Sequence, residues 1–78
     1  MVRAGERYEE QGVIVEVVEV NPLQFFDKRK GLQVAYRIRD GDWVSPIAHW
    51  WQLEREDPRP IIERIVENYL AIRNQLRR

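Results

Sequence analysis

The sequence of 78 residues contains no cysteine and no threonine, and it has one serine, Ser45, and one histidine, His49. Without cysteine there can be no disulfide, no thiolate metal site and no cysteine nucleophile, which is compatible with a reducing compartment. Catalysis by serine would need Ser45 and His49 together, and nothing around them resembles a nucleophile motif. We therefore predict a protein that is not an enzyme and has no catalytic residue.

Signals for metals and cofactors are equally sparse. His49 with Asp40 and Asp42 is a weak candidate ligand set, because a predicted hairpin tip already explains both aspartates. The four glycines are isolated from one another, so no glycine-rich loop is present that could hold a phosphate. We expect no metal and no cofactor.

Long apolar runs are also missing. None could span a bilayer, and the N-terminus lacks the apolar core of a signal peptide, so we expect a cytoplasmic protein without a membrane partner. Thirteen basic and thirteen acidic residues give a formal charge of zero, which argues against capture of nucleic acid by bulk charge. With 44% hydrophobic residues, the chain is typical of one folded domain covering residues 1–78.

The first two thirds of the chain carry strand patterns. Residues 13–20 are mostly valine and isoleucine, and Asn21-Pro22 is expected to end that strand because proline cannot donate to a ladder. Residues 23–31 are predicted to form a projecting loop. Residues 32–39 alternate between apolar and polar side chains, and Asp40-Gly41 predicts a tight hairpin into a strand over 42–45.

A helix is predicted at the C-terminus. Asp57 and Pro58 are typical of an N-cap and a first helical position, and the apolar residues that follow have helical spacing over 58–77. The fold class is therefore α+β, a small antiparallel β-barrel or bent sheet over residues 5–54 followed by one C-terminal helix. The expected core consists of Val15, Val17, Leu32, Val34, Tyr36, Ile38, Trp43, Ile62, Ile65, Tyr69 and Ile72.

The order of motifs within residues 5–54 is Gly5-x-x-Tyr8, a valine-rich strand, Val34-x-Tyr36, a hairpin, and Trp43-Val44-x-Pro46-Ile47 before an acidic stretch. This order resembles small Src-homology-3-like (SH3-like) barrel proteins, many of which are encoded by bacteriophages and mobile elements. The resemblance implies five short strands and brings no catalytic residue. A barrel followed by a helix also looks like the small archaeal chromatin proteins, but those are rich in lysine and strongly basic, unlike this neutral chain.

Two functions are compatible with these features. Three tryptophans within nine residues exceed what a small core needs, and adjacent Trp50 and Trp51 cannot both point inward on a strand. We therefore predict a binding or regulatory module whose protein partner contacts exposed aromatic side chains, with Phe25, Phe26, Trp50 and Trp51 as candidates. The alternative is a nucleic-acid-binding barrel whose basic loop and strand share one face, formed by Lys28, Arg29, Lys30, Arg37 and Arg39.

A homodimer is also predicted. The apolar arc of the C-terminal helix is about half its circumference, wider than one small sheet commonly covers. Its margins would then remain in water unless a second copy covered them. The expected dimer contacts are Ile61, Val66 and Leu70.

Overall fold

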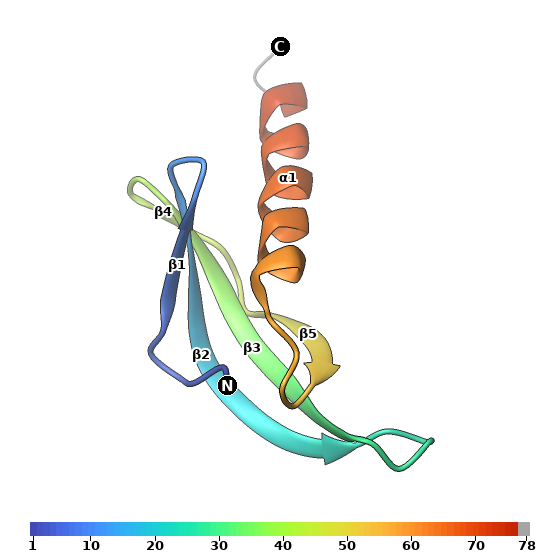
Figure 1. The fold of residues 1–78 in the computed structure, drawn as a ribbon. Coiled ribbons are helices and arrows are strands. Elements are labelled where there is room, and N and C mark those ends of the chain that lie inside the picture. Colours follow the sequence, from blue (N-terminus) through green and yellow to red (C-terminus); the bar gives the residue numbers. More distant parts are fainter. Residues whose placement is uncertain (77–78) are drawn as a thin grey trace.

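The computed structural model describes residues 1–76 and contains one antiparallel sheet and one helix (Figure 1). Along the chain these are β1 (Arg7–Glu10), β2 (Val13–Gln24), β3 (Lys30–Asp40), β4 (Trp43–Val44), β5 (Ala48–Leu53) and α1 (Arg59–Leu76). The α+β prediction with a C-terminal helix is confirmed. The sheet is open and does not close into a barrel; β2 and β3 curve along their length instead.

Strand β3 organises the sheet. Strand β2 pairs along one edge of β3, and β1 pairs with the first four residues of β2. The other edge of β3 is shared by two strands, because β4 pairs with Arg39 and Asp40 while β5 pairs with residues 31–36. The open sheet therefore has two outer edges, one formed by β1 and the later part of β2 and one by β4 and β5.

The expectation that Asn21-Pro22 ends the second strand is wrong. Strand β2 continues to Gln24, with Pro22 opposite Leu32. The reason is that β1 pairs only with residues 13–16, so β2 has no neighbour on that side near Pro22. Proline is tolerated where its nitrogen faces an open edge, because no ladder hydrogen bond is lost there.

The predicted loop over 23–31 is correspondingly shorter. Leu23 and Gln24 pair with Gly31 and Lys30, so the turn comprises only residues 25–29. The amide of Lys28 donates to the carbonyl of Phe25 at 2.9 Å, and Lys28 has a positive φ of 70° that closes the turn. The feature is a long hairpin with a tight tip, which extends away from the helix in Figure 1.

The two faces of the sheet differ in what covers them. Val15 pairs with Ile38, and Val34 pairs with both Val20 and Trp50, on the face that we call the helix face. The opposite, outer face carries polar pairs such as Glu16 with Arg37. A bulge between Val17 and Glu19 inserts one extra residue in β2. Because of this extra residue, the next valine, Val20, lies on the helix face like Val17.

Helix α1 closes the core. Its backbone approaches β1 and β2, and Ile62 and Val66 are buried against the valines of the sheet. The carboxylate of Asp57 accepts from the amide of Arg59 at 3.1 Å, so the predicted cap is present and the helix begins one residue later than expected.

Most of the predicted core is confirmed. Six of its members are buried, namely Val15, Val17, Leu32, Val34, Ile38 and Ile62, while Tyr36, Ile65 and Tyr69 are half-buried against them. Trp43 and Ile72 were predicted wrongly, because they are 49% and 58% exposed. The buried residues that the prediction missed include Val2, Val13, Trp50 and Val66.

Candidate functional site

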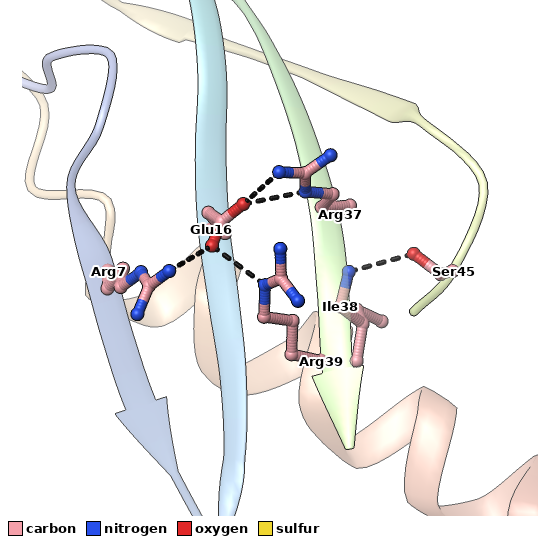
Figure 2. Close-up of polar contacts among 6 residues, drawn as sticks. All are labelled: Arg7, Glu16, Arg37, Ile38, Arg39 and Ser45. Atoms are coloured by element: carbon pink, nitrogen blue, oxygen red, sulfur yellow. Dashed lines mark hydrogen bonds and ion pairs between the residues drawn. The ribbon is translucent and has the colours of Figure 1, made fainter. Parts of the chain in front are cut away.

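A cluster of charged side chains lies on the outer face (Figure 2). The carboxylate of Glu16, which projects from β2, accepts hydrogen bonds from Arg37 at 2.6 Å and from Arg39 at 2.9 Å, both on β3. Arg7 reaches the same carboxylate from β1 at 2.9 Å. The register produces this meeting, because Glu16 is paired with Arg7 on one side and with Arg37 on the other. Three strands are thereby joined by one carboxylate.

The electrostatics of this cluster favour the charged form of Glu16. Its side chain is almost fully covered, and the hydrogen bonds from Arg39 and Arg37 lower its pKa from 4.5 to about 2, against the opposing effect of burial. Three guanidinium groups meet a single carboxylate, so the cluster keeps an excess of positive charge. A hollow of about 320 Å³ lies beside it on the surface.

The basic residues do not form the single face that the nucleic-acid alternative required. Lys30 begins β3, whereas Arg37 and Arg39 are near its other end, about 23 Å and about 30 Å further along the strand. Arg29 at the hairpin tip is paired with Asp27 at 2.5 Å. The hydrogen bonds that Arg29 donates lower the pKa of Asp27. The prediction therefore divides into a hairpin tip and an outer-face cluster.

A second feature is an apolar groove between β4 and the last turns of α1. It has a volume of about 530 Å³ and is lined by Asp40, Trp43, Tyr69, Ile72, Arg73 and Leu76. We call it the aromatic groove, because the ring of Trp43 stacks on that of Tyr69 with centroids 5.5 Å apart and an interplanar angle of 11°. Its size is within the usual range for ligand pockets.

Polar contacts fix the base of the aromatic groove. The hydroxyl of Tyr69 donates to the carboxylate of Asp40 at 2.6 Å, and Arg73 donates to the same oxygen at 3.0 Å. Both residues come from α1, whereas Asp40 ends β3, so these bonds hold the helix to the tip of the sheet. Sequence reasoning missed this site, because a hairpin aspartate and two helical residues about 30 positions away carry no local signal of their contact.

The four aromatic residues predicted to bind protein have different surroundings. Trp50 is only 5% exposed and donates from Nε1 to Gln52 at 2.8 Å, so it belongs to the core and cannot contact a partner in this conformation. Trp51, on the outer face, is 56% exposed. Phe26 is fully exposed at the hairpin tip, and Phe25 lies where a Cβ of residue 31 would be, which only Gly31 permits.

The residues predicted to form a dimer are mostly used within one chain. Val66 is completely buried, so this prediction is wrong for Val66, and Ile61 and Leu70 are packed against the core at its margins. The apolar arc is covered in its first half because β1 and β2 both contribute to the surface beneath the helix. Its exposed apolar side chains are instead Ile72 and Leu76, in the last turns.

Of the scarce catalytic residue types, Ser45 has a structural role, and the ring of His49 lies 6.4 Å from that of Trp51. The hydroxyl of Ser45 accepts from the amide of Ile38 at 2.8 Å (Figure 2). It also donates to the carbonyl of Pro46 at 2.9 Å. In residues 1–76, no group of three or more candidate ligands could hold a metal ion. Nor does that part of the chain contain a helix with the length and apolar content needed to cross a bilayer.

Comparison of this chain with protein families, curated proteins and solved structures finds no match. Function must therefore be inferred from the surfaces described above.

Proposed function

We propose that this protein is a small non-enzymatic binding module that holds a protein partner in the aromatic groove. The observation that carries the proposal is the groove itself. Trp43, Ile72 and Leu76 are large apolar side chains, and each is exposed by about half or more around one concave surface. Exposed apolar side chains that gather at one place are typical of interaction sites.

The groove is also rigid at its base. Trp43 is held by stacking on Tyr69, and Tyr69 is held by its hydrogen bond to Asp40. Ordering a side chain on binding costs free energy, so an aromatic anchor that is already ordered binds more tightly. Tryptophan and tyrosine are also the residue types that most often dominate interface energies. The expected ligand is one or two apolar side chains of a partner protein.

The experiment compares four immobilised proteins as baits in lysate of the native host: the unmodified protein, Trp43→Ser, Ile72→Ser and Val18→Ser. Val18 is an exposed apolar residue on β2 outside the groove, so its replacement is the matched control. We expect the unmodified protein and Val18→Ser to retain the same partner, and the two groove variants to lose it. Equal retention by all four baits, or recovery of nucleic acid without protein, would contradict the proposal.

Phe25, Phe26 and Trp51 stay predictions as further protein contacts, and so does the relation to Src-homology-3-like proteins of bacteriophages. The resemblance rests on the order of sequence motifs, and the strand count of five agrees with it, although the sheet is open.

A second candidate, nucleic-acid binding, is favoured by the excess positive charge around Glu16. The guanidinium groups of Arg7, Arg37 and Arg39 outnumber the carboxylate they contact. Phosphate contacts release condensed counterions, so binding must weaken as salt is raised. The unmodified protein should then be retained on single- or double-stranded nucleic acid at low salt, and Arg37→Gln with Arg39→Gln should abolish retention. Absence of retention by the unmodified protein at low salt would eliminate this candidate.

A further inference from the structure

Strand β5 forms part of an outer edge of the sheet, and its hydrogen bonds alternate in direction. The amide of Glu54, just after β5, donates to the carbonyl of Lys30 at 3.1 Å, so Glu54 and Lys30 are a hydrogen-bonded pair with β3. In an antiparallel ladder, bonded and non-bonded pairs alternate. Ala48, Trp50 and Gln52 therefore bond to β3, while His49, Trp51 and Leu53 direct their N–H and C=O groups away from the sheet.

One contact supports this assignment independently. The amide of Leu53 donates to the side chain of Glu56 at 2.9 Å, as it can only if it faces outward. Within residues 1–76 the amides of His49 and Trp51 have no such partner. The backbone of α1 approaches β1 and β2 and not β5, so the helix does not cover this edge.

The side chains of β5 are unusual for an edge strand that is exposed to solvent. Strand β5 contains no aspartate, glutamate, lysine or arginine, and Trp51 and Ile47 are each about half exposed. Natural sheets protect open edges with charged side chains, proline within the strand or a covering element. None of these protects His49 and Trp51.

The edge is complementary to itself. If two copies of β5 are related by a two-fold axis at Trp50, His49 of one copy is opposite Trp51 of the other, and Trp51 is opposite His49. The outward backbone groups of Leu53 already bond to Glu56, whereas those of His49 and Trp51 are available. Each pair therefore exchanges two hydrogen bonds, and the contact contains four. Because β5 carries no formal charge, no like-charge repulsion opposes the pairing.

The side chains fit the same register. The indole of Trp51 would lie on the outer face beside the imidazole of His49 in the second copy, and cross-strand aromatic pairs of this kind stabilise antiparallel sheets. Ile47, one residue before the strand, would come opposite Leu53, which is half-buried. Exposed apolar area on both chains would thus be removed from water.

We propose that the β5 edge binds a second copy of this chain, forming a two-fold dimer with one continuous sheet through paired β5 strands. This goes beyond the proposed function, because it uses a different surface from the aromatic groove. It also replaces the dimer contacts predicted at Ile61, Val66 and Leu70 with His49 and Trp51.

The test measures mass by light scattering across a dilution series. The unmodified protein should give twice the mass of one chain at high concentration and dissociate on dilution. His49→Pro should raise the dissociation constant at least about thirtyfold, because each copy loses one outward donor. It should leave the circular dichroism unchanged, since the nitrogen of residue 49 makes no bond to β3. His49→Thr, which keeps the amide, is the matched control and should remain dimeric.

Trp51→Lys provides a second variant, because this side chain is exposed in the single chain and a lysine on an edge opposes strand pairing. It should also be monomeric. A monomer at millimolar concentration, or a dimer that persists in both His49→Pro and Trp51→Lys, would overturn the proposal. The proposal would also be overturned if the amides of His49 and Trp51 became protected from hydrogen exchange only when a different protein binds. Trp43→Ser should stay dimeric, which separates a failure of this proposal from a failure of the aromatic groove.

Discussion

The two outer edges of the sheet differ in charge and in what lies beside them. Strand β1 has three charged residues among its four, and the nearby backbone of α1 and the ion pair from Arg7 to Glu16 hold it in place. Strand β5 has six uncharged residues, and the backbone of α1 does not closely approach it. Charge on an edge discourages pairing with another chain. This difference is the basis of the proposal that β5, and not β1, pairs with a second copy.

The largest expected effect concerns the two adjacent tryptophans of β5. Trp50 is buried on the helix face and its ring is 5.2 Å from that of Tyr36, whereas Trp51 faces solvent. Trp50→Ala should lower the free energy of unfolding by about 4 kcal/mol because it leaves a cavity. Trp51→Ala should change it by about 0.5 kcal/mol or less in the monomer. Urea unfolding at low protein concentration measures both, and equal losses would show that the edge is not open.

A smaller effect is expected from acid, which acts on the β1 side. The folded pKa of Glu16 is about 2, below its ordinary value of 4.5, so its contribution is present above pH 4.5. That contribution is lost as the pH falls towards 2, and from the two pKa values it amounts to about 3 kcal/mol. Thermal unfolding between pH 5 and 2 should show this loss.

Glu16→Gln is the variant that isolates this carboxylate. It should be less stable than the unmodified protein at pH 5 and should lose less stability on acidification, whereas Glu19→Gln, at an exposed site on the same strand, should follow the unmodified protein. If Glu16→Gln showed the same acid dependence as the unmodified protein, the ion cluster would not secure this side of the sheet.

These contrasts show which features could be predicted from the sequence. Alternating side chains predicted the buried positions of β3, and the Asp40-Gly41 signal correctly placed a turn before β4. The extension of β2 past Pro22 was missed, because it depends on how short β1 is, and no local pattern encodes that length. Burial of Val66 and exposure of Ile72 also depended on where the sheet ends beneath the helix.

The candidate site was less predictable. Arg37 and Arg39 were identified by their alternation as one face of a strand, and they do share the outer face. Their pairing with Glu16 requires the register between β2 and β3, which the sequence alone does not specify. The aromatic groove joins β4 to the end of α1 by long-range contacts. Local patterns therefore predicted elements better than the surfaces those elements build.

The smallest effect concerns the β4 end of the open edge, where α1 is tied to the sheet. Tyr69→Phe removes the hydrogen bond to Asp40 and should lower the free energy of unfolding by about 1 kcal/mol, with the bond from Arg73 remaining. Tyr36→Phe is the control, because in residues 1–76 its hydroxyl has no such bond, and it should be close to neutral. Thermal unfolding of both variants checks this difference, and an equal response would mean that Asp40 does not anchor the helix.

The central claim is that the β5 edge of the sheet, and not the β1 edge, pairs with a second copy. Amide hydrogen exchange of single residues, followed by NMR at high and low protein concentration, tests it most directly. The amides of His49 and Trp51 should exchange slowly at high concentration and rapidly on dilution, while that of Trp50 stays slow throughout because it bonds to β3. Rapid exchange of His49 and Trp51 at every concentration would contradict the claim.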